Sequence, residues 1–373
     1  MSEKHARLPA LDLMRGLVML LMAVDHSSDA FNGGRLFTDS VQFYHPGAPL
    51  PAAQFLVRWV THLCAPTFLF LAGVGLAFSI AKERARGASE RSIDLYLLVR
   101  GLIIWACELW VAYFVMPPGM YIFQVLYAIG SSYLFMIALR RLPARVNLAL
   151  AIALFLTGEL LAGLVTRSGP PSLGAVLLVT GGNPRPLIVA YPTLHWLALM
   201  LLGWWWGQRL LVTSARSVPA VPLVRQLAFA ALGLFALFLA VRGLNSYGNM
   251  RLLRDDLSIV QWLHVSKYPP SLSYVALELS LMCAGLAVCF RATTDHAPSP
   301  NNPLMVLGQA PLFFYLLHFP LLEVSARELG LHKALGIGGA LLGALAVTLV
   351  LYPACRRYRS YKAAHPRSLA RFI

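Results

Sequence analysis

The residues with the clearest chemical potential are Arg15 and His26, which lie eleven positions apart in the apolar segment LDLMRGLVMLLMAVDH. On a helix, eleven steps separate two residues by about 16 Å and return to within about 20° of the same face. One face would therefore carry a permanent cation at one end and a titratable imidazole, beside Asp25, at the other. Because lipid tolerates such side chains poorly, we expect them to line a protein interior or a wet cavity. The alternative is ordinary: Arg15 reaches the lipid headgroups and His26 marks the helix end.

The elements that must position these residues are membrane-spanning helices. Of the 373 residues, 58% are hydrophobic and 13% are charged, whereas soluble domains are about 25% charged. The net charge of +15 requires no nucleic-acid partner, because basic cytoplasmic loops account for it in a polytopic protein. The five cysteines show neither a metal-ligand spacing nor a disulfide framework, and we interpret them as core residues.

Apolar stretches bounded by proline, glycine and charge predict an all-α, polytopic transmembrane bundle of about ten spans. They fall near residues 9–27, 55–80, 95–116, 121–139, 146–166, 193–213, 224–242, 271–291, 304–326 and 335–355. The first run leads into Asp25 and His26 rather than a cleavage site, so we expect this helix to be retained. No short repeat or separate soluble segment is evident, and residues 1–373 are expected to form a single transmembrane domain.

Basic residues predict the orientation of this bundle. With the N-terminus in the cytoplasm, four basic stretches fall inside: KERAR from Lys82, RRLPAR from Arg140, the loop from Arg209 to Arg225, and RRYRSYK from Arg356. The positive-inside rule thus predicts a multi-pass protein of the cell (inner) membrane with both termini cytoplasmic. The long loops at 28–54, 167–192 and 243–270 then lie outside, where ordered loops commonly carry binding function.

In this topology several titratable residues converge on the outer half of the bundle. They are Asp25, His26, His62, His195, His264 and Lys267, with His45 in an outer loop and His318 nearer mid-membrane. Histidine exchanges protons near neutral pH and suits general acid–base catalysis. Ordinary interpretations stay open: His62 could bond a carbonyl freed by Pro66, and His318 could be a satisfied core residue. Lys267 could be an interfacial lysine before a rigid Pro-Pro turn.

Four segments, in order, resemble bacterial membrane proteins related to heparan-alpha-glucosaminide N-acetyltransferase, of the transmembrane acyltransferase superfamily. They are LDLMRGLVMLLMAVDH from Leu11, RWVTHLCAPTFLFLAG from Arg58, KYPPSL from Lys267 and PLFFYLLH from Pro311. The resemblance implies that an acetyl group passes from cytoplasmic acetyl-CoA to an acceptor on the other side of the membrane. It makes Arg15 the residue near CoA and His26 the counterpart of the catalytic histidine in sugar-acetylating relatives.

The sequence departs from the heparan enzyme at one of these positions. In that enzyme's pattern, asparagine matches His26 and the proposed catalytic histidine lies in the following outer loop. Here that loop offers only His45, between Tyr44 and Pro46. The identity of the catalytic base is therefore left open at this point.

The candidate residues have the chemistry that acetyl transfer needs. The candidates for binding acetyl-CoA are Arg15, whose guanidinium suits phosphates, and Lys267. The catalytic candidates are His26, Asp25, His62 and His318. His26 would deprotonate a hydroxyl or amine of an extracytoplasmic acceptor, expected to contain carbohydrate. His62 would act as a second base or donate to the oxyanion, and transfer is either direct or through acetyl-histidine.

The expected partners are the lipid bilayer, acetyl-CoA as donor substrate and the carbohydrate acceptor, with no metal and no nucleic acid; a homodimer is left open.

Another class of protein also stays open. Ten spans with buried ionisable groups are equally typical of a proton-coupled transporter or flippase of a polar or glycan-type solute. The lack of an evident internal repeat counts against that carrier. A non-catalytic scaffold would not need so many outer-side histidines.

Overall fold

The computed structural model describes residues 8–215, 220–294, 296, 298–365 and 368–372. Its elements are α1 (Pro9–Phe31), α2 (Ala52–Val60), η1 (Thr61–Leu63), α3 (Cys64–Ala85), α4 (Glu90–Val115), β1 (Tyr121–Phe123), α5 (Val125–Leu139), α6 (Ala144–Thr166), α7 (Leu173–Ala175), η2 (Val176–Thr180), β2 (Leu187–Val189), α8 (Thr193–Ala215), α9 (Ala220–Leu244), α10 (Ile259–Leu263), α11 (Leu272–Ala292), α12 (Pro303–Gln309), α13 (Pro311–Glu328), α14 (Ile337–Ala364) and η3 (Leu369–Phe372). The predicted basic loop from Arg209 to Arg225 lies partly outside the described residues. The described chain is mainly helical, and its strands β1 and β2 have three residues each, which confirms the all-α prediction.

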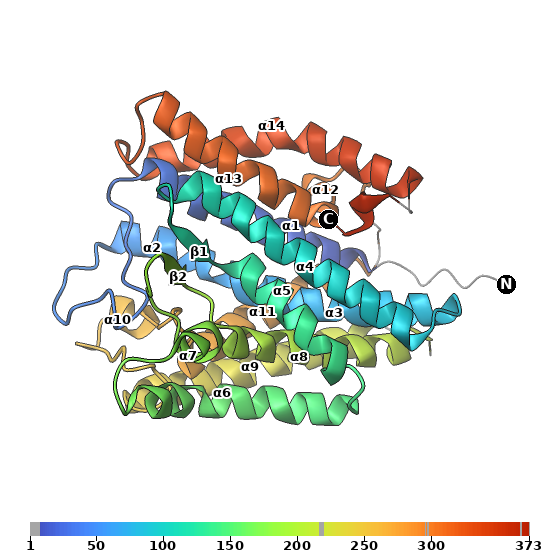
Figure 1. Cartoon of the computed structure of the whole chain (residues 1–373), viewed down its shortest axis with the longest axis horizontal. Coiled ribbons are helices and arrows are strands. Elements are labelled where there is room, and N and C mark those ends of the chain that lie inside the picture. The colour runs from blue at the N-terminus through green and yellow to red at the C-terminus, as the bar shows by residue number, and fades with distance from the viewer. Residues whose placement is uncertain (1–7, 216–219, 295, 297, 366–367, 373) are drawn as a thin grey trace.

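The long helices lie side by side along the long axis of the molecule (Figure 1). Helix α1, which carries Arg15 and His26, packs against α3, α11, α12, α13 and α14. The start of α1 and the end of α14 lie at one end of the bundle, while α2, α10, β1 and β2 lie at the other (Figure 1). The central position of α1 explains how a helix with four charged residues, Asp12, Arg15, Asp25 and Asp29, is accommodated among apolar ones.

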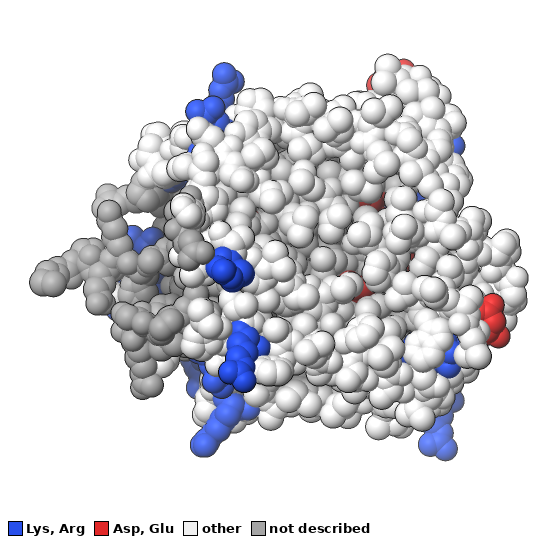
Figure 2. Space-filling view, turned by 180° about the vertical axis from the view of Figure 1, so that it is seen from behind, with Lys and Arg blue, Asp and Glu red and all other residues white. Residues whose placement is uncertain are grey.

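Most of the long helices are apolar enough to cross a membrane. In the described part of the chain, six pass by length and composition: 52–85, 90–115, 144–166, 221–244, 272–292 and 337–364. The bent pair α12–α13 would be a seventh. A broad belt of uncharged surface separates the charged side chains at the two ends of the molecule (Figure 2). Each of the ten predicted stretches overlaps a helix, but 121–139 begins in strand β1 and 304–326 is divided between α12 and α13. The number of spans and the side of the termini stay predictions.

Two pairs of helices approach each other at backbone distance. A Cβ added to Gly203 on α8 would lie 1.9 Å from the carbonyl oxygen of Phe70 on α3, and one on Gly73 would lie 2.1 Å from that of Met200. Helices α1 and α12 cross in the same way, because a Cβ on Gly16 would lie 2.0 Å from the carbonyl oxygen of Leu304. Small residues are the usual means by which helices pack closely in membranes.

Helices α12 and α13 meet at an angle of 96°. Ala310 sits between them with a non-helical backbone, φ −129° and ψ 44°, and Pro311 begins α13. Proline disfavours helical geometry in the residue before it and lacks the N–H that a continuing helix needs. The break places the end of α12 and the first turn of α13 against the interior of the bundle, where they line a cavity.

Candidate active site

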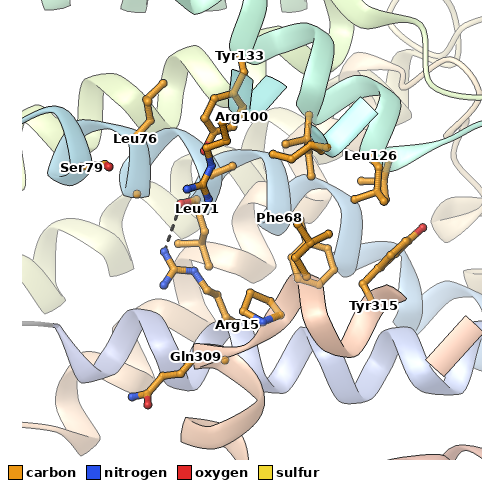
Figure 3. A pocket seen from close by; sticks show the side chains of 18 of the residues that line it. Arg15, Phe68, Leu71, Leu76, Ser79, Arg100, Leu126, Tyr133, Gln309 and Tyr315 are labelled. Carbon is orange, nitrogen blue, oxygen red and sulfur yellow. Dashed lines mark hydrogen bonds between the residues drawn. The ribbon is translucent and has the colours of Figure 1, made fainter. Parts of the chain in front are cut away.

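A cavity of about 300 Å³ opens between α1, α3, α4, α5 and the break of α12–α13. Three basic side chains from three helices line it: Arg15 of α1, Arg100 of α4 and Lys362 of α14. Figure 3 shows Arg15 and Arg100 reaching into it from opposite walls. Three cations converging on one cavity make a binding site for a polyanion such as a phosphate ester.

The two arginines are held in place by polar neighbours. Arg15 donates to Asp12 Oδ1 at 3.0 Å and to the carbonyl oxygen of Leu71 at 3.4 Å (Figure 3). Gln309, at the end of α12, donates to the other oxygen of Asp12 at 3.0 Å. Arg100 donates to the Tyr96 hydroxyl at 2.8 Å and lies over the ring of Tyr133, 5.4 Å from its centroid. The cations are thus oriented before a ligand binds.

A second, small cavity of about 30 Å³ adjoins the first. It is lined by Met22, Asp25, His26, Thr61, Cys64, Ala65, Phe68, Gln124, Val125, Tyr191, Lys267 and Tyr315. Phe68, Val125 and Tyr315 line both cavities and so form the wall between them. A cavity of this size has room for water but not for an acetyl group together with its acceptor, so we expect side chains of this wall to move when substrates bind.

His26 is linked to His318 by a short hydrogen bond. The two atoms, His26 Nδ1 and His318 Nε2, are 2.7 Å apart. On the far side of its ring, His318 Nδ1 lies 3.0 Å from the carbonyl oxygen of Phe314.

This arrangement assigns the protons of both rings. A carbonyl only accepts, so Nδ1 of His318 carries a proton and its Nε2 accepts from Nδ1 of His26. The lone pair of His26 then lies on Nε2, for which no hydrogen bond is found among the described residues. His26 therefore has the tautomer of a general base.

Asp25 belongs to a buried chain of ion pairs. Arg35 donates to Asp25 at 2.7 Å and to Asp29 at 2.9 Å. Arg58, only 4% exposed, donates to Asp25 and, through Nε, to Asp39, each at 2.7 Å. Buried charges persist only when they are paired and hydrogen-bonded in this way. The chain ties the loop after α1 to helix α2.

Asp39 lies in the loop between α1 and α2, and its charge is strongly favoured. Burial alone would raise the pKa of this carboxyl, but the guanidinium of Arg58 and the neighbouring His62 outweigh burial and hold the pKa well below its usual range. Its main-chain oxygen also accepts from the Lys267 N–H at 2.8 Å. Asp39 thus joins the loop before α11 to the same network.

A family model described as heparan-alpha-glucosaminide N-acetyltransferase, catalytic, matches residues 7–240. That is more than half of the chain. The chain belongs to this family. No curated protein matches the sequence. The family match confirms the resemblance inferred from the four segments, and with the apolar helices it identifies a membrane protein of an acetyltransferase family.

The family match includes Arg15, His26, Arg58, His62 and Arg100, and it ends in α9. Lys267 and His318 lie beyond it, yet the structure brings both to the same place as His26. Residues from the two ends of the acetyltransferase chain therefore meet at one site.

The other predicted histidines lie outside the two cavities. His62 is buried with Nε2 3.3 Å from Asp39 Oδ1, so it faces the ion-pair chain. His195 packs against Gly158 of α6, where a Cβ would lie 2.7 Å from its Nε2. His264 lies 2.8 Å from the carbonyl oxygen of Thr38, and His45 is exposed. These positions favour the ordinary interpretation, in which the four histidines pack between elements or hold loops in place.

Lys267 lines the cavity of His26, whereas Arg15 lines the larger one. The sequence reading grouped these two cations as residues for the donor, and the structure places them in different chambers. It also adds site residues that the sequence reading did not single out: Arg35, Arg58, Asp39, Arg100, Tyr315 and Lys362. Arg100 carried the same signal as Arg15, a charge inside an apolar stretch.

Proposed function

We propose that the protein transfers an acetyl group from cytoplasmic acetyl-CoA to a hydroxyl or amine of a carbohydrate-containing acceptor outside the cell (inner) membrane. In this proposal residues 1–373 act as one transmembrane domain with both termini in the cytoplasm. The observation that carries the proposal is the pair of adjoining cavities. One is lined by cations, and the other is lined by His26, whose Nε2 has no hydrogen bond among the described residues. The family match supports acetyl-CoA as the donor.

The donor is proposed to bind from the cationic cavity. Arg15, Arg100 and Lys362 would bind the phosphates of acetyl-CoA, which need fixed positive charge. The pantetheine arm would then pass between Phe68, Val125 and Tyr315 toward His26. Arg15 and His26 are about 16 Å apart along α1, a span comparable with the length of that arm.

The chemistry is proposed to be general base catalysis by His26. Nε2 takes the proton of the acceptor O–H or N–H while the acceptor atom attacks the thioester carbonyl. When the C–S bond of the tetrahedral intermediate breaks, the same nitrogen returns the proton to the CoA sulfur. His318 holds the tautomer and stabilises the imidazolium that forms in between. Asp25 adds a fixed negative charge beside His26.

Purified protein in liposomes tests the proposal through binding and turnover of acetyl-CoA. Arg15→Ala should raise the KM for acetyl-CoA about tenfold or more, because a hydrogen bond to a charged group contributes about 1.5–3 kcal/mol. His26→Ala should lower kcat by about 10²–10⁴ with little change in KM. The matched control is Arg86→Ala, which removes an exposed arginine whose ion pair is with the neighbouring Glu83.

The control should behave as wild type. Absence of acetyl-CoA binding by the wild type, or equal turnover in all variants, would refute the proposed function. Solute uptake that is lost in the same variants, without acetyl transfer, would instead identify a carrier.

A further inference from the structure

Lys267 is buried and lines the small cavity that also contains His26, the proposed general base. It is 3% exposed, and it lines the small cavity together with Asp25 and His26. It lies between α10 and α11, at the end of the bundle that carries the long loops (Figure 1). Burying an ammonium group costs several kcal/mol unless it is paired and hydrogen-bonded.

Two of the neighbouring carboxylates are already paired with other cations, and a third, Glu278 on α11, is fully buried without a hydrogen bond of its own among the described residues and lies within range of the Lys267 charge. Asp25 accepts from Arg35 and Arg58, and Asp39 accepts from Arg58. Among the described residues, no hydrogen bond or ion pair reaches Nζ of Lys267; its contact is with the ring of Tyr268, 5.4 Å from the centroid. Three N–H donors of a buried ammonium are therefore available at the cavity.

The main chain of Lys267 is fixed at both sides. Its N–H donates to the carbonyl oxygen of Asp39 at 2.8 Å, and the residue forms an isolated bridge with Pro270. The Ser266 hydroxyl donates to the carbonyl oxygen of Pro269 at 3.0 Å. A positive charge carried by such a fixed backbone segment needs little reorganisation when a negative charge develops nearby. This is the condition for electrostatic stabilisation.

We infer that Lys267 is a catalytic residue whose ammonium group stabilises the oxyanion of the tetrahedral intermediate in acetyl transfer. The inference rests on the proposed function. It differs from a role in binding the CoA phosphates, because Phe68, Val125 and Tyr315 separate the Lys267 cavity from the one that holds Arg15. Lys267 therefore meets the acetyl end of the donor.

The transfer forms one bond to the acetyl carbon and breaks one. The acceptor atom forms a bond to the acetyl carbon, and the C=O π electrons move to the oxygen, which accepts a hydrogen bond from Nζ of Lys267. The carbonyl then re-forms, the C–S electrons leave with sulfur, and His26 supplies the proton that makes the CoA thiol. Lys267 keeps all of its protons throughout.

The test compares Lys267→Arg, which keeps the charge, with Lys267→Gln, which removes it, in liposomes with acetyl-CoA as donor and glucosamine as acceptor probe. Removal of one oxyanion-stabilising group lowers kcat by about 10²–10³. The Gln variant should show that loss with the KM for acetyl-CoA unchanged, and the Arg variant should retain clearly more activity. Lys333→Gln is the matched control, since its ammonium lies over Phe37 in another loop.

Thermal unfolding of each variant shows whether it is folded, and the Arg and Gln variants are compared at equal folded amount. Equal kcat in these two variants, or a raised KM with unchanged kcat, would overturn the role of Lys267. These outcomes require a wild type that transfers acetyl groups. A wild type without any transfer is a separate result, and it would refute the proposed function itself.

Discussion

The hydrogen bond between His26 and His318 determines which nitrogen can act as a base. His318 is fully buried and receives its orientation from the Phe314 carbonyl oxygen, so it cannot turn without losing that bond. His26 in turn presents Nε2 to the cavity. The same logic of nucleophile, base and orienting group recurs in unrelated enzymes.

His318→Ala should therefore lower kcat by about 10²–10⁴ while the KM for acetyl-CoA changes little. The reason is that the ring of His26 loses its fixed tautomer and the partner that stabilises its charged form. Steady-state kinetics in liposomes measure the effect, with His45→Ala, an exposed loop histidine, as the control. Unchanged kcat in the His318 variant would show that the pair is only structural.

Asp39→Asn should destabilise the fold by about 3–5 kcal/mol, because it leaves Arg58 buried with one partner fewer. The pKa of Asp39 is depressed in the folded state, so its contribution is complete above the ordinary aspartate pKa of about 3.9. It is lost only as the pH falls toward the folded pKa.

Thermal unfolding between pH 7 and pH 3 measures both effects. Wild type should stay more stable than the variant at pH 7, and the difference should shrink in acid. The control Asp256→Asn changes an exposed carboxylate in the loop between α9 and α10 and should have little effect. A difference that grows in acid would contradict the account of Asp39.

At the residue scale, spacing predicted some members of the site and missed others. The pairing of Arg15 with His26 followed from helix geometry, because both belong to one helix. His318 and Lys267 were chosen as polar residues near apolar spans, but their contact with the site depends on packing between distant segments. Arg58 lay in a motif already singled out, and its partners Asp25 and Asp39 could not be known from one sequence.

At the scale of elements, glycines determine how closely the helices that frame the site approach each other. Gly203 is the example on α8, facing the backbone of α3. Gly233 on α9 is the opposite case, since nothing lies within 4 Å of a Cβ built there.

Gly203→Ala should destabilise the protein by about 1–3 kcal/mol, as overpacked sites do. Gly233→Ala makes the same chemical change where there is space, and it should be neutral or slightly stabilising because alanine favours helix. Thermal unfolding of the two variants in one detergent compares them directly. Equal stability of both would mean that α3 and α8 are not in backbone contact.

The helices themselves were predicted well, since long apolar stretches have a strong signal. The break between α12 and α13 was not predicted, and residues 304–326 were expected to form one span. Proline at position 311 is compatible with both a helix start and a kink, so the sequence does not decide. The parallel pairing of β1 with β2 joins two loops far apart in the chain, and no local pattern reveals such a contact.

At the scale of the whole molecule, a belt with few charged side chains on its surface separates the two ends, where most of the visible charged side chains lie (Figure 2). The long loops lie toward one end, and the start of α1 and the end of α14 lie at the other (Figure 1). The orientation predicted from basic residues assigns the end with the long loops to the outside.

Cysteine labelling of intact cells tests that orientation. His45→Cys, in the loop after α1, should react with a membrane-impermeant maleimide added outside, because that loop is predicted to be extracytoplasmic. Arg86→Cys, in the loop after α3, should react only after the cells are opened. Both sites are exposed in the structure. The reverse pattern would invert the proposed direction of transfer.

The central claim is that an acetyl group crosses the membrane through this protein. Sealed liposomes containing radiolabelled acetyl-CoA only in their lumen, with glucosamine or methyl glucoside only outside, test it most directly. We expect labelled product outside, at a rate that His26→Ala reduces to background. Product that forms only when donor and acceptor share one compartment, or equally with His26→Ala, would contradict the account.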